Sequence, residues 1–301
     1  MVLLSIEFYI LAILCAFFRG IDPIFAKRGL ESGGNWIQNT FQTLVVRTGL
    51  AWGVLIVISN GKNMLEGISI PIILLFVCAG VVAAAMGQLS YYRGIDRMGA
   101  SICATITNSR PLFAVLLAVV WLGENMTVSG VIGVISIVMG VVFITRSKSG
   151  NIAGWKRSDI VFPLFAAVAF AAGNVIRKFG FMEDAAITAI QALAINDLAA
   201  LVVVGVYGVV IGKGRELAAG NRESYRNFGL SGVCVFLAML TLYEALIRGP
   251  VSVADPILGT GPLFTVIIAA SVLKKVERIT KGFVIGTLLI IAGVVLLSSM
   301  P

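Results

Sequence analysis

The chain contains no histidine and few charged residues, and both shortages narrow its class. Histidine is the side chain that most readily exchanges protons near neutral pH, and it is the commonest metal ligand. Only 13% of the 301 residues are charged, against roughly 25% in a typical soluble domain. The polar surface that a soluble fold of this length requires is therefore missing. These shortages exclude an ordinary cytosolic enzyme, a disordered chain and a fibrous protein.

The motifs of enzymes and metal proteins are also missing. The four cysteines stand in apolar runs without the paired spacing of a zinc site or a disulfide framework. No carboxylate–histidine motif and no phosphate-cradling glycine loop is present. We therefore expect no enzyme activity, no cofactor and no metal. The net charge of +8 indicates loops facing anionic lipid and predicts no nucleic-acid partner.

Long apolar runs are what the chain has in abundance. Apolar residues make up 58% of it, and the mean hydropathy is +1.00. A bilayer core of roughly 30 Å needs about 20 apolar residues per helix. We predict an all-α integral membrane protein with ten transmembrane helices, without a cleaved signal peptide. The predicted spans are Leu4–Ala26, Trp36–Ile58, Ile70–Tyr92, Ala100–Leu122, Val128–Thr145, Ile160–Phe179, Ile187–Ile211, Phe228–Ile247, Ser252–Leu273 and Gly282–Ser299.

The second half of the chain repeats the first. At an offset of 151, Tyr92 matches Tyr243, and Pro111-Leu112-Phe113 matches Pro262-Leu263-Phe264. After a two-residue insertion, Gly133 matches Gly286 and Gly140 matches Gly293. Each half holds five helices, an odd number, so the second half enters the membrane from the opposite side. Residues 1–150 and 151–301 are thus predicted to be inverted repeats within one membrane domain, with substrate bound near the midplane between them.

The motifs resemble those of a known family. Arg110-Pro111-Leu112-Phe113 stands in the fourth helix, and Trp121-Leu122-Gly123-Glu124-Asn125-Met126-Thr127 leads into a glycine-rich fifth helix. This pattern is similar to the EamA-type branch of the drug/metabolite transporter superfamily. The second half departs from it, with Lys274-Lys275-Val276 before Glu277. The resemblance implies a ten-helix fold and transport of small metabolites, often export.

The orientation in the membrane stays open. Most lysines and arginines fall in the loops after the first, third, fifth, seventh and ninth helices. The positive-inside rule then places both termini outside the cytoplasm. Members of the family usually keep both termini inside, so charge and resemblance disagree.

Charged residues inside the spans are the candidates for function, because each costs at least about 2.5–3.5 kcal/mol at the bilayer centre. Arg110 leads, since a guanidinium stays charged and its fork suits a carboxylate or a phosphate. The alternative is a structural ion pair with Asp197, Glu244 or Asp255. The candidate substrate-binding residues are Arg110, Arg47, Arg19, Asp22, Gln88, Tyr91, Tyr92, Asn108, Tyr243 and Glu244.

Two further sets follow from the same reasoning. Without histidine, proton coupling requires a carboxyl group, and the candidates are Asp22, Asp197, Glu244 and Asp255. Alternatively, all four carboxyl groups are held in pairs and take no part in proton coupling. Helix breaks could serve gating, and the candidates are Pro23, Pro111, Gly259 and Pro262.

These features predict a secondary-active transporter working by alternating access, for export or exchange of a small polar metabolite. The buried arginines favour an anionic or zwitterionic substrate such as an amino acid, an organic acid or a phosphorylated compound. The alternatives are a multidrug or organic-cation exporter and a lipid-intermediate flippase of the same fold. Expected partners are the substrate, the lipid bilayer and a coupling proton or counter-substrate, in a monomer or homodimer. We expect a multi-pass protein of a prokaryotic inner membrane.

Overall fold

The computed structural model describes residues 6–110, 112–113, 128–147, 150–151, 154–183, 187–248, 257–272, 277–278 and 280–298. In the first half these form α1 (Ile6–Glu31), α2 (Trp36–Ile58), α3 (Ile70–Ala79), η1 (Gly80–Gly87), α4 (Gln88–Met98), α5 (Ala100–Thr107) and α7 (Val128–Arg146). In the second half they form η2 (Arg157–Ile160), α8 (Val161–Glu183), α9 (Ala189–Val210), η3 (Gly214–Leu217), α10 (Arg222–Arg248), α12 (Gly261–Val272) and α13 (Lys281–Ser298). Two-residue strands, β1 (Gly150–Asn151) and β2 (Glu277–Arg278), pair antiparallel between the helices.

The predicted all-α membrane fold is confirmed. Within the described residues, six helices are long and apolar enough to cross a membrane, and α3, η1 and α4 together form one of them. Helices α7 and α13 contain shorter apolar segments. Helices α5 and α12 are the described parts of the fourth and ninth predicted spans.

Several helices extend beyond the apolar runs that predicted them. Helix α2 has the predicted ends, since the Asn35 side chain accepts a hydrogen bond from the Gln38 N–H and caps it. Helix α1 continues to Glu31, which pairs with Lys27 one turn earlier at 2.7 Å. The helix thus continues through polar residues beyond the apolar segment. This is possible because a helix satisfies the hydrogen bonds of its backbone internally in any solvent.

The third spanning helix contains a π-helical segment, η1, beside a close contact with α9. A Cβ atom added to Gly80 would lie 2.2 Å from the Asn196 carbonyl oxygen, so only glycine permits this approach. Such π segments are rare and are frequently found at functional sites. Gln88 follows directly after η1, so the segment sets the direction of the polar residues of α4.

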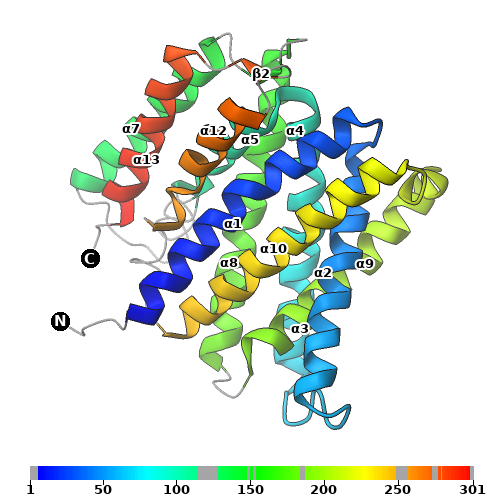
Figure 1. Cartoon of the computed structure of the whole chain (residues 1–301). Coiled ribbons are helices and arrows are strands. Elements are labelled where there is room, and N and C mark those ends of the chain that lie inside the picture. Colours follow the sequence, from blue (N-terminus) through cyan, green and yellow to red (C-terminus); the bar gives the residue numbers. More distant parts are fainter. Residues whose placement is uncertain are drawn as a thin grey trace.

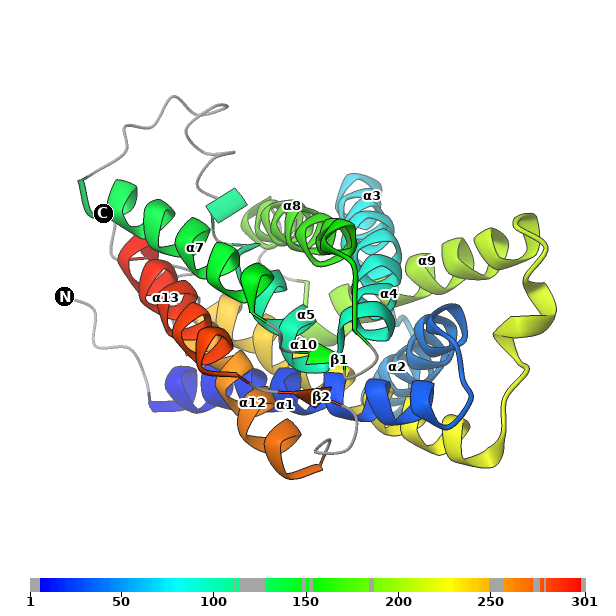
Figure 2. The ribbon, with the colours of Figure 1, turned by 90° about the horizontal axis from the view of Figure 1, so that it is seen from above.

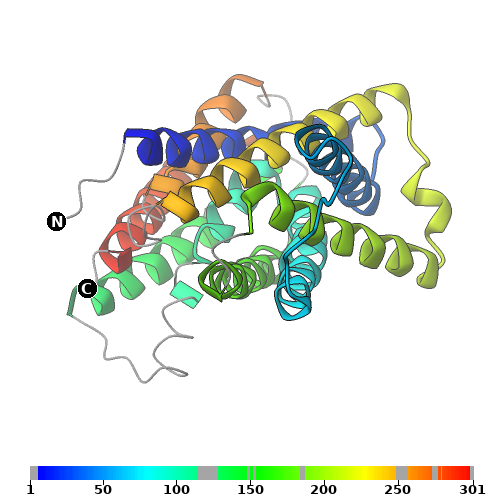
Figure 3. The ribbon, with the colours of Figure 1, turned by 90° about the horizontal axis from the view of Figure 1, so that it is seen from below.

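The helices pack in pairs related by a pseudo-two-fold axis, which exchanges the two halves of the chain. Helix α1 lies along α10, and its counterpart α8 lies along α3, η1 and α4 (Figures 1 and 2). Figure 3 shows α8 beside the third spanning helix from below. Helix α2 packs against α9, and α7 packs against α13.

Glycines in α7 and α13 fix the axis of this exchange. A Cβ atom on Gly140 would lie 2.6 Å from the Gly286 carbonyl oxygen. A Cβ atom on Gly293 would lie 2.6 Å from the Gly133 carbonyl oxygen. Because Gly133 matches Gly286 and Gly140 matches Gly293 in the repeat, each contact is the image of the other.

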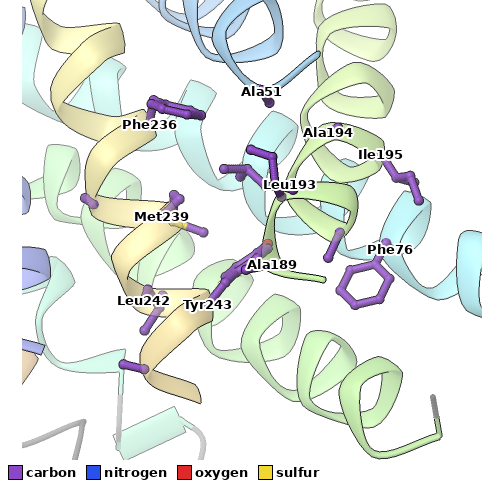
Figure 4. Packing of buried hydrophobic residues seen from close by; sticks show 14 of the residues in the cluster. Ala51, Phe76, Ala189, Leu193, Ala194, Ile195, Phe236, Met239, Leu242 and Tyr243 are labelled. Carbon is purple, nitrogen blue, oxygen red and sulfur yellow. The ribbon is translucent and has the colours of Figure 1, made fainter. Parts of the chain in front are cut away.

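The two ends of the bundle differ in composition. We name the membrane face where α1 begins the Glu7 face and the one where α1 ends the Glu31 face. Near the Glu7 face, a large apolar cluster joins α3, α9 and α10 (Figure 4). It includes Phe76, Leu193, Phe236, Leu242 and Tyr243. This cluster closes the bundle on that side.

Candidate functional site

A polar cavity lies at the centre of the bundle, between the halves. Its volume is about 50 Å³, so in this conformation it has room for a few water molecules and is smaller than a typical small-molecule site. Residues of both halves line it: Arg19, Asp22, Arg47, Ala83, Ala84, Gln88, Tyr91 and Arg110 from the first, and Phe170, Asn174, Arg177, Val235 and Met239 from the second. We call it the central cavity.

A buried ion pair between α2 and α9 joins the halves at this cavity. The Arg47 guanidinium donates from Nε to Asp197 Oδ2 at 3.0 Å and from Nη2 to Asp197 Oδ1 at 2.5 Å. Its Nη1 donates to Gln88 Oε1 at 2.7 Å. The Asn196 amide donates to Asp197 Oδ1 at 3.0 Å. Both charges therefore have several hydrogen-bond partners, which makes the buried pair tolerable.

The network continues from Gln88 to a second carboxylate on α1. The Gln88 amide donates to the Tyr92 hydroxyl at 2.9 Å, and that hydroxyl donates to Asp22 Oδ1 at 3.0 Å. The Ser231 hydroxyl on α10 donates to the same Asp22 oxygen at 2.5 Å. Hydrogen bonds thus connect Asp197 of α9 to Asp22 of α1 through side chains of two further helices, α2 and α4, which fixes the orientation of every member.

Arg19 and Arg177 make different contacts, with neutral groups. The Arg177 guanidinium donates to Asn174 Oδ1 at 2.9 Å and to Asn196 Oδ1 at 3.1–3.2 Å. The Arg19 guanidinium lies 5.7 Å from the centre of the Phe170 ring and donates to the Met239 sulfur at 3.8 Å. The described hydrogen-bond and ring partners of both guanidinium groups are thus neutral, in contrast to the carboxylate partner of Arg47.

Arg110 follows a break in the helix that begins with α5. Helix α5 ends at Thr107, and Asn108 and Ser109 form a turn before Arg110. The Asn108 amide donates to the Gly259 carbonyl oxygen at 2.9 Å. These two positions are 151 residues apart, so the contact joins a residue to its own repeat equivalent. The break turns Arg110 into the central cavity.

A smaller cavity adjoins the first beside α5 and α12. Its volume is about 40 Å³, and it is lined by Asn108, Thr107, Ala104, Leu258, Gly261 and Thr265. It shares Arg19, Tyr91 and Arg110 with the central cavity. These three side chains therefore stand between the two spaces.

The structure gathers most of the residues singled out from the sequence. Six of them line the central cavity, and Asn108 lines the adjoining one. Tyr92 and Asp197 hold the network beside it. Pro23 is buried in α1 directly after Asp22, and Gly259 accepts the bond from Asn108.

The remaining candidates lie elsewhere. The Glu244 side chain is 33% exposed and pairs with Arg248, which lies 3.7 Å from Glu7. It therefore stands at the Glu7 face, because the helix ends there, and the structure does not bring it into the cavity. Tyr243 is buried in the apolar cluster beneath the Arg177 guanidinium. Asp255 and Pro111 lie outside the described residues, and Pro262 belongs to α12.

Asn174 and Arg177 line the cavity but were not among the substrate-binding candidates from the sequence. The predicted span ended at Phe179, which placed Arg177 beside Lys178 at a helix end. Helix α8 continues to Glu183, so Arg177 lies more than one turn inside and is buried. The spacing of Asn174 and Arg177, three residues apart on one helix face, was the signal available.

Two inverted halves of apolar helices around an enclosed polar cavity define a multi-pass membrane protein with the architecture of secondary transporters. The sequence profile of the EamA-like transporter family matches residues 7–146 and again residues 158–299. The chain belongs to this family. The expected resemblance is thereby confirmed, and it assigns the chain to transport proteins.

Individual relatives are distant. An uncharacterized transporter of Archaeoglobus fulgidus is 26% identical over 229 residues, which cover 76% of this chain and 77% of that protein. An uncharacterized transporter of Clostridium kluyveri is 24% identical over 141 residues, so the match spans 46% of this chain and 44% of that protein. An uncharacterized protein of Methanocaldococcus jannaschii is 28% identical over 139 residues, 46% of this chain but 96% of that protein.

A solved structure supports the fold. A chain titled only "Crystal structure of protein" superimposes with a TM-score of 0.64 over 95% of both chains, at 14% sequence identity. This likeness concerns the arrangement of helices and carries no information on substrate.

Proposed function

We propose that the protein is a secondary-active transporter of a small anionic or zwitterionic metabolite, working by alternating access around the central cavity. The observation that carries this proposal is the charge of the lining. Arg19, Arg47, Arg110 and Arg177 face the cavity, whereas Asp22 is the one carboxylate among the lining residues described. Such an excess of guanidinium attracts a carboxylate or a phosphate in a low-dielectric site.

The arginines divide into two groups. Arg47 already holds Asp197 in a bidentate pair, so its role is structural support of the cavity. Arg19 and Arg177 come from different halves and have neutral partners in the described residues, so they are the groups that could meet an anion. Arg110 also lines the cavity. Asp22 lies in the same cavity, where it could accept the ammonium group of an amino acid. An organic cation would meet repulsion from these arginines, which disfavours the cation-exporter alternative.

Alternating access would move one set of helices against the other. The Glu7 side is sealed by the apolar cluster, so opening towards it would require α3 and α9 to part from α10. The proposal includes export or exchange across a prokaryotic inner membrane, with Asp22 as the carboxyl group placed to couple a proton.

A ligand screen tests this proposal. A ligand that binds the folded state raises the unfolding temperature by mass action. Purified protein is heated with panels of amino acids, organic acids, phosphorylated compounds and organic cations. We expect anionic or zwitterionic compounds to stabilise the wild type but not Arg110→Ala, and to show counterflow in proteoliposomes. Arg215→Ala, an exposed arginine of η3, is the matched control. Stabilisation by organic cations alone would reverse the proposal.

A further inference from the structure

A line of buried polar side chains connects the central cavity with the Glu31 face. The first turns of α2 carry Gln38, Asn39, Gln42 and Thr43, all buried in the bundle. We call these four residues the polar seam. Helix α10 packs along α2 here, and a Cβ atom on Gly232 would lie 3.1 Å from the Thr43 carbonyl oxygen.

The seam contains polar atoms that the protein does not satisfy. Within the described part of the chain, both amide atoms of Gln38, both of Gln42 and Nδ2 of Asn39 lack a hydrogen-bond partner. Leaving one such buried group unsatisfied costs about 1–3 kcal/mol. Five of them along one helix face is more than a packed interior tolerates. Water is the partner that satisfies such groups in folded proteins.

The inner end of the seam reaches the network around Asp22. The Thr43 hydroxyl donates to Asn39 Oδ1 at 3.2 Å and lies close to the Tyr92 side chain. Tyr92 in turn donates to Asp22, which lines the central cavity. A polar route therefore runs from Asn39 to the cavity without crossing an apolar layer.

The outer end of the seam lies beside an exposed loop. Gln38 packs against Gly220, where an added Cβ atom would lie 2.0 Å from the amide nitrogen. Gly220 is exposed in the connection that precedes α10. Asn35, the cap of α2, also donates to Glu216 in η3 at 3.3 Å. The outer end of the seam is thus covered by the loops of the Glu31 face.

The repeat supplies an internal comparison for this seam. At an offset of 151, its four positions correspond to Ala189, Ile190, Leu193 and Ala194 of α9. All four belong to the apolar cluster near the Glu7 face, where Leu193 and Ala194 pack near Phe236 and Phe76 (Figure 4). The equivalent positions are therefore polar in α2 of the first half and apolar in α9 of the second half.

We propose that the polar seam is an aqueous path that admits water and small hydrophilic solutes from the Glu31 face as far as Asp22. The apolar cluster of α9 blocks the equivalent route from the Glu7 face. This deepens the proposed transport function, on which its purpose rests, because it gives the central site access to one membrane face only.

Cysteine accessibility tests the path without a substrate. In a variant lacking Cys15, Cys78, Cys103 and Cys234, single cysteines replace seam residues (Asn39→Cys, Gln42→Cys, Thr43→Cys) or their counterparts (Ile190→Cys, Leu193→Cys, Ala194→Cys). Purified protein reacts with the anionic reagent 2-sulfonatoethyl methanethiosulfonate, and mass spectrometry follows the modification. Because thiol modification depends on access, we expect the seam cysteines to react about tenfold or more faster than their counterparts.

Three controls keep the result interpretable. Each variant must be monodisperse, and each must label completely in denaturant. If one seam variant fails to fold, the other two seam variants still give the result. Equal protection of all folded seam and counterpart cysteines would overturn the path, and so would equally fast labelling of both sets.

The two proposals fail separately. If the seam labels and no anion or zwitterion stabilises the protein, the substrate class is wrong and the path stands. If anions bind and the seam is protected, the path is wrong and the substrate class stands.

Discussion

The two halves of the molecule share a scaffold and differ in the chemistry they place on it. At four equivalent positions near the centre, the first half carries polar residues and the second half carries none. In the repeat, Arg19 corresponds to Phe170, Asp22 to Gly173, Arg47 to Leu198 and Gln88 to Met239. The helices around them nevertheless pack in equivalent pairs. The helix packing is thus the same in both halves, whereas the residue types at the cavity differ between equivalent positions.

The second half contributes its own polar groups at positions where the first has none. Asn174, Arg177, Asn196 and Asp197 correspond to Pro23, Ala26, Val45 and Val46. Asp197 is the partner of Arg47, so the charge placed by one half is neutralised by the other. The difference teaches that neither half holds a complete site, and that the ion pair is where the halves depend on each other most.

Removing Asp197 should therefore have the largest effect. Asp197→Ala leaves the Arg47 charge buried without its partner, which costs about 3–5 kcal/mol. We expect a strongly lowered unfolding temperature in detergent. The double variant Arg47→Met with Asp197→Leu should recover much of this loss, because two apolar side chains replace a buried pair at little cost. An Asp197→Ala variant as stable as the wild type would contradict the pairing.

Arginines from the two halves should matter equally for ligand binding. Arg110→Ala and Arg177→Ala each remove a charged donor worth about 1.5–3 kcal/mol to an anion. We expect roughly a 10- to 150-fold weaker apparent affinity in either variant, measured by thermal shift with the stabilising anion from the screen. Arg215→Ala should bind like the wild type. A loss confined to one half would show that the site is not shared.

The axis between α7 and α13 should respond symmetrically. Gly140→Ala and Gly293→Ala each force a Cβ atom to within 2.6 Å of a carbonyl oxygen. Overpacking of this kind costs about 1–3 kcal/mol, and we expect similar losses in thermal stability from both. Gly53→Ala is the control, since an added Cβ atom there has nothing within 4 Å. Unequal losses would break the two-fold comparison.

Glu244 should have the smallest effect. Its ion pair with Arg248 lies at the Glu7 face, and partly exposed pairs contribute about 0–1 kcal/mol. Glu244→Gln should leave anion binding unchanged and thermal stability nearly so. Asp22→Asn, at the centre, should alter the binding of zwitterions. If Glu244→Gln abolishes binding instead, the cavity has been assigned to the wrong carboxylate.

The fold could be predicted from the sequence because its cause is local. An apolar run of about 20 residues must form a helix in lipid, and an odd number of helices per repeat must invert the second half. Charged helix ends were harder to predict, since apolarity marks the lipid core and not the last turn. That error hid Arg177, whose helix continues to Glu183.

The partners of the site residues could not be predicted. The sequence offered Asp197 as a partner for Arg110, and the structure pairs it with Arg47. Which arginine meets Asp197 depends on the close approach of η1 to α9 at Gly80 and on the position of α2 along α9. These are distances between helices far apart in the chain, and composition does not encode them.

The contact between Asn108 and Gly259 has an evolutionary consequence. In a symmetric dimer of half-length chains, a residue on the axis meets its own copy, and both copies mutate together. Joining the halves in one gene releases each such residue from its twin. Here one position kept a side chain that donates and the other offers a bare backbone oxygen that accepts. Divergence of this kind allows a duplicated scaffold to form an asymmetric site, whose two sides differ.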